Sequence, residues 1–555
     1  MEEQNQNEMN ADGQKLNRLQ MLRAVDFERV SFRILIGIIF LLPLFALPFG
    51  IFVVDFYKAM FLYLGVSVAS ICFLLARVYK RSIIFPKSFI IASLFLIALA
   101  WLVASVFSGN IALSLFGAGY ETGTFSFFLF LSIIAFLVAV LFRSAKRIVL
   151  LYKGIFVSAT VLFVMQFLHT GFGAALPPWD MFQGVLASVL GNWNDLGIFF
   201  GLIAIIALSS LEFGGENRNA RIFLRAILSM SLLAVFFVNF STLQFVLGFS
   251  VLALLVYRLA SPPYFEGSPR RGNVDFLNAS FFVFLAIVIF SVAHEWTGSL
   301  VNFFGIQFTQ VYPSWTATVG VIKGTLSTDL FFGSGPNTFS YDWLVFKPEA
   351  ISGTVFWDTQ FKSGIGRLPS LVAETGLLGG TTLIIFISSL LYGGKAVISY
   401  REHNLERMLL VSSFLGSVYL WIFTIVYSPG FLIFIFAGIF TGVFVASLCV
   451  AQKTEMAEIT FGKSTKKGFA LYLAVVFAIL SFAYSVYFFG TKYLAGYFYT
   501  TALQEASVRN DIGKADAYLQ RAVWLDPQDT YFRSVAEIGL LQLGQLIARS
   551  SKAET

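Results

Sequence analysis

The sequence predicts an all-α, polytopic membrane protein, because apolar segments of membrane-spanning length fill most of the chain. Of its 555 residues, 57% are hydrophobic, 65 are phenylalanine and only 12% are charged. Soluble domains carry roughly 25% charged residues, and a helix needs roughly 20 mostly apolar residues to cross a bilayer. Lysine and arginine also collect in alternate connections, which is typical of a chain that crosses the membrane repeatedly.

About thirteen apolar segments approach the length that a crossing requires. They cover residues 33–53, 58–76, 88–107, 124–142, 147–168, 194–211, 221–238, 241–258, 276–293, 371–393, 406–428, 430–449 and 468–489. Only the polar break at 239–242 separates the seventh segment from the eighth. If these two formed one kinked span, the count would be twelve and every later connection would change sides. Two separate spans keep all basic connections on one side and are therefore predicted.

The basic connections are expected to face the cytoplasm. Arginines precede the first segment, so the polar residues 1–30 are predicted to be a disordered cytoplasmic N-terminus, followed by a membrane domain over residues 31–490. The connections after even-numbered segments are basic, whereas those after odd-numbered segments carry almost no lysine or arginine, apart from the long one at 294–370. The net charge of +7 is therefore a signature of topology, and no nucleic-acid partner is expected.

The long connection at 294–370 is predicted to be a folded cap on the outer face. Loops longer than roughly 15 residues are usually functional or disordered, and this one is rich in tryptophan and glycine. Residues 313–327 are expected to form a short helix. The segment FGSGPNTF at 332–339 predicts a tight turn, in which Gly333 and Gly335 permit a left-handed backbone and close approach of other groups. Such a turn could offer its amides to an anion, or serve only as a structural turn.

The tail over residues 491–555 is predicted to be helical and extracytoplasmic. The window 496–529 matches one tetratricopeptide repeat, which is a helical hairpin. The residues that fit the repeat are Tyr499, Ala502, Ala515, Leu519, Ala522 and Pro527. Leu503 departs from the small residue preferred there, and a generic amphipathic hairpin remains the alternative. One repeat cannot bury its own apolar face, so it is expected to pack on the cap, on the membrane domain or on a partner.

The order of these features resembles the O-antigen ligase / O-antigen polymerase family of bacterial membrane glycosyltransferases. The resemblance is carried by GNWNDLG at 191–197, FGSGPNTF at 332–339 and LVAETGLLGG at 371–380. It implies transfer or polymerisation of a polyprenyl-diphosphate-linked glycan on the outer face of the bacterial cytoplasmic membrane, in cell-surface polysaccharide assembly. The implied partners are that glycan carrier, the lipid bilayer and, through residues 491–555, an envelope-assembly protein. Many members also carry tetratricopeptide repeats after the last span.

Two departures from this family leave the activity open. Its ligases carry a His-Asn pair before the Glu of the re-entry segment, where this chain has Ile365 and Gly366. They also carry an arginine just outside the seventh and eighth spans, where this chain has NFSTLQ at 239–244. The chain is therefore expected to be a glycosyltransferase that carries its chemistry differently, or a non-catalytic membrane scaffold for envelope glycan assembly. A lipid-linked glycan transporter is a further alternative, although few charged residues lie inside the spans.

The candidate catalytic residues, Arg367 and Glu374, lie where the cap returns to the membrane. Arg367, with Lys362 nearby, is suited to binding the donor diphosphate, or could anchor its helix at the lipid headgroups. Glu374 is costly in lipid unless it is paired or faces a cavity, so it is expected to pair with Arg367 or to act as the base that activates the acceptor. The other residues predicted to bind substrate are Gly333, Gly335, Asn337, Trp357 and Asn194. No cluster has metal-ligand spacing, so neither a metal nor another cofactor is expected.

Overall fold

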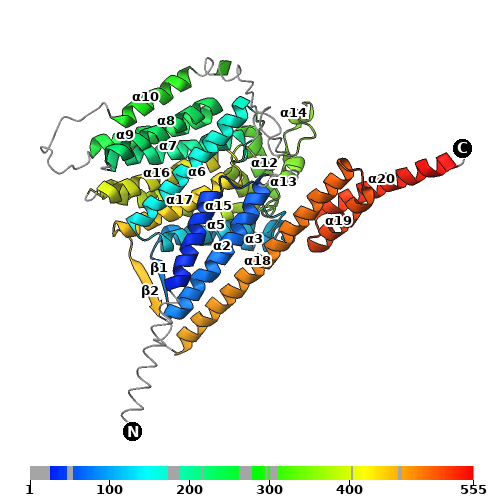
Figure 1. The fold of residues 1–555 in the computed structure, drawn as a ribbon, viewed down its shortest axis with the longest axis horizontal. Coiled ribbons are helices and arrows are strands. Elements are labelled where there is room, and N and C mark those ends of the chain that lie inside the picture. The colour runs from blue at the N-terminus through cyan, green and yellow to red at the C-terminus, as the bar shows by residue number, and fades with distance from the viewer. Residues whose placement is uncertain are drawn as a thin grey trace, which may run out of the picture.

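Helices build almost the whole of the described chain, as the sequence predicts (Figure 1). The structure is a computed structural model that describes residues 25–46, 54–172, 188–214, 217–261, 278–293, 298–299, 310–401, 404–460 and 465–553. A helix over residues 25–41 begins inside the stretch predicted to be disordered, and the rest of that stretch, residues 1–24, lies outside the described residues. This helix ends two residues before Pro43, because the residue that precedes a proline disfavours helical backbone. Of the first apolar segment, predicted at 33–53, the structure describes residues 33–46, and residues 33–41 of these are helical.

Ten helices in the described part of the chain are long and apolar enough to cross a membrane. They are α2 (Val54–Lys80), α3 (Phe89–Val106), α6 (Ala145–Phe172), α7 (Trp193–Phe213), α8 (Arg218–Val238), α9 (Ser241–Ala260), α15 (Arg367–Ser399), α16 (Asn404–Val426), α17 (Phe431–Val450) and α18 (Thr465–Ser507). Two further apolar helices are shorter, α5 (Phe125–Leu141) and α10 (Ala279–Val292). Each predicted segment thus contains a helix, and the protein is a polytopic helical membrane protein; ten of these helices have the length and composition of a crossing.

The seventh and eighth segments are two helices, α8 and α9, and the chain reverses between them. Asn239 adopts a left-handed backbone (φ 46°) that ends α8. Val238 at the end of α8 and Leu243 at the start of α9 both lie against Gly197 at the start of α7. At the other end of α7, Glu212 pairs with Arg258 of α9 at 3.1 Å. Helix α9 therefore runs parallel to α7, while α8 runs antiparallel to it.

Two basic connections that are far apart in the sequence meet at one pole of the molecule, here called the basic pole. Strand β1 (Ser82–Pro86) pairs antiparallel with β2 (Met456–Thr460), with Ser82 opposite Thr460. The connection before α3 and the connection after α17 therefore lie on the same side, as the alternation of charge predicts. The assignment of this side to the cytoplasm remains a prediction.

The opposite pole, here called the cap pole, carries the cap and the tail. The cap helices are α12 (Trp315–Thr328), α13 (Phe339–Phe346) and α14 (Glu349–Ser352), and α4 (Ile111–Leu115) lies in the connection after α3. The helix predicted at 313–327 is thus α12. Residues 294–297 and 300–309 of the predicted cap lie outside the described residues.

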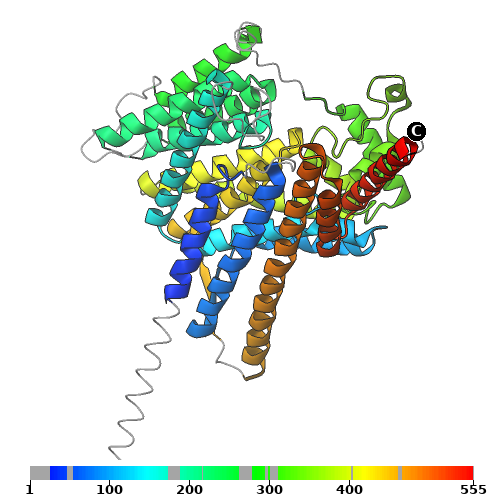
Figure 2. The same ribbon diagram turned by 45° about the vertical axis from the view of Figure 1, so that its right-hand side comes forward.

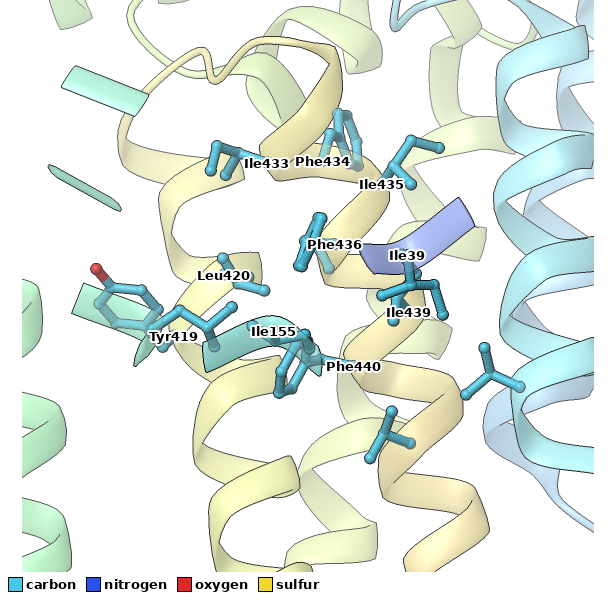
Figure 3. Packing of buried hydrophobic residues seen from close by; sticks show 14 of the residues in the cluster. Ile39, Ile155, Tyr419, Leu420, Ile433, Phe434, Ile435, Phe436, Ile439 and Phe440 are labelled. Atoms are coloured by element: carbon cyan, nitrogen blue, oxygen red, sulfur yellow. The ribbon is translucent and has the colours of Figure 1, made fainter. Parts of the chain in front are cut away.

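Helix α17 forms the centre of the core. It is apolar on all sides and buried on all sides, as expected of a helix surrounded by others. Figure 3 shows the side chains of α17 meeting those of α16, α6 and the helix over residues 25–41. Gly438 and Gly442 lie against Leu131 and Ala135 of α5, where a side chain would not fit. Small residues permit such close approach between membrane helices.

The tail begins within a membrane-spanning helix. Helix α18 runs unbroken from Thr465 to Ser507 and packs along α2, beside the first helices in Figure 2. The domain boundary predicted at residue 490 therefore falls inside one continuous helix. Helix α19 (Ile512–Leu525) folds back on the end of α18, and α20 (Asp529–Ala553) follows.

The end of α18, α19 and α20 share an apolar core, as the repeat pattern requires. Five of the residues that fit the repeat lie in it, namely Tyr499, Ala502, Ala515, Leu519 and Ala522. The helical hairpin is thus shown, whereas its assignment as a tetratricopeptide repeat stays a prediction. The hairpin contacts the membrane domain as well: the ammonium of Lys492 donates to the carboxylate of Asp526 at 3.0 Å and to the carbonyl of Gly117 at 3.4 Å.

Candidate functional site

The cap turn and the re-entrant end of α15 form one backbone junction. Helix α15 is broken at Gly376, whose backbone is left-handed (φ 62°, ψ −158°). Beyond the break, the amides of Leu377 and Leu378 donate to the carbonyls of Leu330 and Phe331 in the cap, at 2.9 and 3.1 Å. The cap therefore replaces hydrogen bonds that the broken helix has lost, which buried backbone groups require.

The glycine turn completes this junction from the other side. The amide of Gly335 donates to the carbonyl of Glu374 at 2.9 Å. Gly333 and Gly335 both have positive φ, 67° and 105°. A Cβ on Gly333 would lie 2.2 Å from the carbonyl oxygen of Ala373, and one on Gly376 would lie 2.4 Å from that of Phe331. Two of the three segments that carry the family resemblance, FGSGPNTF and LVAETGLLGG, thus form complementary halves of a single contact.

Glu374 holds the glycine turn in place with its side chain. Its Oε2 accepts a hydrogen bond from the amide of Asn337 at 2.9 Å, and its Oε1 accepts one from the amide of Phe339 at 3.3 Å. Its Oε1 also lies 3.8 Å from Nη1 of Arg367. Both side chains are buried, with 5% of Arg367 and 1% of Glu374 exposed. This geometry favours the pairing of Glu374 with Arg367 over a role in which Glu374 reaches an acceptor.

Arg367 is fixed by backbone groups as well as by Glu374. Its Nη1 donates to the carbonyl of Lys362 at 3.0 Å, and its amide donates to the carbonyl of Tyr427 at 3.2 Å. Its guanidinium also lies against Gly123, where a Cβ would be 2.3 Å from Nη2. Its Nε is buried without a hydrogen-bond partner among the described residues. Arg367 is therefore an internal cation with one unsatisfied donor, and its helix begins at the cap rather than at exposed lipid headgroups.

Three further charged side chains lie near this pair: Lys362, which the sequence predicts, and Glu121 and Lys492, which it did not single out. The connection 116–124 contributes Glu121, whose Oε2 is buried without a partner in the described part of the chain. Burial raises the pKa of the Glu121 carboxyl, and the charges of Lys362 and Lys492 oppose that rise. The ammonium of Lys362 lies 5.9 Å from the centre of the Tyr120 ring. Glu121, Lys362, Arg367, Glu374 and Lys492 are here called the charge cluster.

An apolar groove of about 410 Å³ lies between α5 and α18. Its lining is almost entirely apolar and consists of Phe116, Phe125, Ser126, Leu129, Phe130, Phe477, Leu480, Ser481, Tyr484, Ser485, Phe488 and Phe489. At the cap end, the rings of Phe116 and Phe488 lie 4.8 Å apart. Phe116 precedes Gly117, and the ammonium of Lys492 lies 5.4 Å from the Phe488 ring. Lys492 does not line the groove, so this cation, which is paired with Asp526, lies beyond its Phe488 end.

A second cavity, of about 660 Å³, lies on the other side of the glycine turn, between the connection after α3 and helices α12 and α13. Side chains with hydroxyl, amide or carboxyl groups border it, although most of its exposed lining is apolar, as in the groove. These polar side chains are Ser108, Asn110, Thr325, Thr328, Asp329, Ser334, Thr338, Tyr341 and Asp342. The hydroxyl of Ser334 donates to Asp342 at 2.6 Å. Burial raises the pKa of the Asp342 carboxyl to about 6, although this hydrogen bond opposes the rise. The cavity is here called the hydroxyl cavity.

Asn194 lies in a separate polar group behind the charge cluster. Its amide donates to the side-chain oxygen of Gln310 at 3.3 Å, and the hydroxyl of Tyr427 donates to the same oxygen at 3.1 Å. The next residue, Asp195, accepts from the amide of Gly430 at 2.9 Å. Among the described residues, Tyr427 links Asn194 to Arg367, and Asn194 is not part of the charge cluster.

The aromatic side chains of the cap, including the predicted substrate-binding residue Trp357, lie in different settings. Trp357 is 61% exposed, and its carbonyl accepts from the ammonium of Lys347 at 2.5 Å. Trp343 is buried in the core of the cap with Val321 and Phe339. Of the cap aromatics, Tyr341 lines the hydroxyl cavity while remaining largely exposed. The structure thus does not bring Trp357 to the charge cluster.

Two of the cluster residues had a signal in the sequence. Glu121 is an acid in an almost uncharged connection between two apolar segments, and the connection is rich in glycine. Lys492 follows the last segment on the side that the alternation leaves poor in lysine. In both cases a charge lies where the topology does not require it. Within the described residues, no group of three His, Cys, Asp or Glu side chains could hold a metal ion.

No protein-family model matches the chain, and no curated protein is significantly similar to it.

Proposed function

We propose that the protein transfers a glycan from a polyprenyl diphosphate carrier to an acceptor hydroxyl at the cap pole of the membrane. The observation that carries the proposal is the order of three features: an apolar groove, a charge cluster beyond the Phe488 end of the groove, and a cavity bordered by hydroxyl side chains across the glycine turn. A polyprenyl-linked glycan has the same order of parts, since an apolar chain, a diphosphate and sugars follow one another. The proposal accords with the family resemblance of the sequence.

Each part of the donor has a matching part of the site. The prenyl chain lies along α5 and α18, where aromatic side chains line the groove. The diphosphate lies at Lys362, the exposed cation of the cluster, with the buried charges of Lys492 and Arg367 behind it, because cations stabilise phosphate charge. The buried Nε of Arg367 is the kind of unsatisfied donor that a ligand oxygen can satisfy. Sugar hydroxyls pair with the polar groups of the hydroxyl cavity.

Glu121 is the candidate base. Its partly buried carboxylate has a raised pKa and an Oε2 without a partner in the described residues, and a raised pKa strengthens a general base. In the reaction, the acceptor oxygen forms a bond to the anomeric carbon while the bond from that carbon to the diphosphate oxygen breaks. The acceptor proton passes to Glu121, and the electron pair of the broken bond leaves with polyprenyl diphosphate.

Arg367 and Glu374 serve this reaction in different ways. Glu374 positions the glycine turn between the charge cluster and the hydroxyl cavity. Arg367 remains paired with Glu374 inside the protein, and from there its positive charge stabilises the diphosphate. This division explains how a divergent chain can lack the histidine and the second arginine of the related ligases and still retain a cationic site.

The test is glycan transfer by the purified full chain in liposomes, with a polyprenyl-diphosphate-linked oligosaccharide as donor and release of polyprenyl diphosphate as readout. Lys362→Gln should lower turnover at least about tenfold, since a charge-assisted contact contributes roughly 1.5–3 kcal/mol. Glu121→Gln should lower it by roughly 10²–10⁴-fold, the usual effect of a general base. Lys323→Gln, which changes an exposed lysine of α12, is the matched control and should retain full turnover.

Unchanged turnover by a Glu121→Gln, Lys362→Gln double variant would overturn the assignment of the site. If the wild-type protein binds the donor but never releases polyprenyl diphosphate with any acceptor, the scaffold alternative is correct instead. Movement of intact donor across the liposome membrane would identify a transporter.

A further inference from the structure

A third cavity, of about 700 Å³, lies at the basic pole, far along α3 and α15 from the charge cluster. It opens where the start of α3 meets the ends of α15 and α17. Its lining consists of Lys87, Ser88, Phe89, Ile90, Ile384, Ile385, Ser388, Ser389, Tyr392, Gly393, Lys395, Ala396, Leu448, Lys453 and Thr454. The proposed glycan transfer uses none of these residues.

The apolar part of this cavity faces outward from membrane-spanning helices. Phe89 of α3 is 65% exposed, and Ile384 and Tyr392 of α15 are 65% and 68% exposed. In a membrane helix, side chains exposed in this way contact lipid. The cavity is thus a recess in the lipid-facing surface, with room for acyl chains.

The polar end of the cavity carries an excess of positive charge. Lys87, Lys395 and Lys453 line it, and the acid beside it, Glu455, is paired with Lys87 and is not among the lining residues. The ammonium of Lys395 lies 4.3 Å from the centre of the Tyr392 ring, and that of Lys453 lies 5.7 Å from the Tyr400 ring. The ammonium groups of Lys395 and Lys453 therefore lie close to aromatic rings at the edge of the recess.

Next to the β1–β2 pair, Lys87 is bound to Glu455, which lies two residues after Lys453 in the chain. The amide of Lys87 donates to the carbonyl of Glu455 at 2.9 Å, and its ammonium pairs with the Glu455 carboxylate at 2.8 Å. Ser88, the N-cap of α3, makes no side-chain hydrogen bond to the helix. The first amides of α3 and its dipole therefore add positive potential at the same place.

We propose that this cavity is a binding site for an anionic phospholipid of the leaflet at the basic pole. The phosphodiester lies at Lys87, Lys395 and Lys453 near the start of α3, and an acyl chain lies along Phe89 and Ile384. The proposal commits to a lipid because cations and an exposed apolar recess occur together. Basic pockets between membrane helices on the cytoplasmic side are known to suit anionic headgroups. A bound lipid would contact both α3 and α15 and would stabilise their packing.

The test measures thermal unfolding of the full chain in detergent, with phosphatidylglycerol or phosphatidylcholine of identical acyl chains added. Phosphatidylglycerol should raise the melting temperature more than phosphatidylcholine does. The triple variant Lys87→Gln, Lys395→Gln, Lys453→Gln should bind phosphatidylglycerol at least about tenfold more weakly in native mass spectrometry, because each lysine near an anionic surface contributes to binding. Its unfolding in phosphatidylcholine should match the wild type, which shows that it is folded.

Two controls separate the lipid from its headgroup and the site from general charge. A triple variant of exposed lysines outside the cavity, Lys146→Gln, Lys153→Gln, Lys323→Gln, should keep the preference for phosphatidylglycerol. Ser388→Phe, which fills the recess without changing its charge, should weaken lipid binding, while inorganic phosphate alone should not stabilise the wild type. Equal preference in both triple variants, or full stabilisation by phosphate alone, would overturn the proposal. Glycan transfer can fail while this lipid preference persists, so the two proposals are tested separately.

Discussion

The two poles of the molecule each hold an ion pair that joins distant segments, and the pairs differ in setting. At the cap pole, Arg367 and Glu374 lie 3.8 Å apart and are 5% and 1% exposed. At the basic pole, Lys87 and Glu455 lie 2.8 Å apart and are 57% and 81% exposed. The closer pair is the one in contact with water. Distance alone therefore ranks these pairs in the wrong order of importance.

Burial and backbone contacts decide what each pair contributes. The carboxylate of Glu374 also accepts two amide hydrogen bonds from the glycine turn, so its removal would leave buried donors and a buried guanidinium unpaired. Loss of one partner in such a pair is strongly destabilising. The carboxylate of Glu455 is surrounded by water, which can replace its partner, and exposed pairs contribute little. Four predictions follow this contrast from its largest effect to its smallest.

Replacing Glu374 with Ala should have the largest effect. It removes the acceptor for the amides of Asn337 and Phe339 and leaves Arg367 unpaired in a buried place. We expect a loss of about 3–5 kcal/mol in the free energy of unfolding, measured in detergent by denaturant unfolding. An Arg367→Met, Glu374→Gln double variant should recover part of this loss, because no buried charge remains. Wild-type stability of Glu374→Ala would mean that the pair does not hold the junction together.

The glycine at the break of α15 should rank next. In Gly376→Ala, the alanine must adopt a left-handed backbone, and its methyl carbon would lie 2.4 Å from the carbonyl oxygen of Phe331. We expect a cost of about 1–3 kcal/mol from backbone strain, seen as a lower melting temperature. The matched control is Gly380→Ala in the same helix, where the new Cβ would lie 3.7 Å from a Val372 methyl. Because that contact is ordinary and alanine favours helix, the control should be neutral or slightly stabilising.

Asp342 offers a test of burial through pH. Its folded-state pKa is raised to about 6 from an ordinary value of 3.8, so the folded protein binds a proton more tightly than the unfolded chain does. The stability that this proton provides is present at low pH and is lost as the pH rises from about 4 to about 6. In Asp342→Asn this loss should disappear, which corresponds to a difference of order 1 kcal/mol or more. Melting temperatures of both proteins at pH 4.5 and pH 7 measure it. If the melting temperatures of both proteins change by the same amount between these pH values, Asp342 does not titrate in this way.

Replacing Glu455 with Gln should have the smallest effect. The exposed pair with Lys87 is solvated on both sides, and such pairs contribute roughly 0–1 kcal/mol. The melting temperature should therefore change by little, and raising the salt concentration should remove even that difference. A loss as large as that of Glu374→Ala would show that the basic pole depends on this contact and would end the contrast between the poles.

The sequence was sufficient to predict the helices, because length and apolar composition determine whether a segment can cross a bilayer. It also predicted that α8 and α9 are separate, since only this choice keeps the basic connections together, and the reversal at Asn239 confirms it. For the first segment, hydropathy alone ignores Pro43, and the described helix covers residues 25–41 and so begins before residue 33, where the segment was predicted to begin. The ends of the helices thus depend on local backbone chemistry that a hydropathy pattern does not contain.

The candidate site was predictable only in part. The proximity of Arg367 to Glu374 follows from their spacing on one helix, and the tight turn follows from its glycines. The fit of that turn into the break at Gly376 does not follow from either segment alone, because it is a contact between backbones. Glu121 and Lys492 meet the pair through tertiary packing of the connection 116–124 and α18, which no periodicity reports.

The pairing of β1 with β2 has a consequence for how the protein is made. Residues 82–86 emerge from the ribosome early, whereas their partners at 456–460 emerge only after most of the chain has been synthesised. Proteins fold from the N-terminus onward during synthesis. Strand β1 therefore has no partner until the intervening helices have entered the membrane and β2 has been made. Its closure is then possible only if those helices have been inserted with both strands on the same side. The small sheet therefore forms late in synthesis, and it cannot form in a chain whose helices have been inserted with the two strands on opposite sides of the membrane.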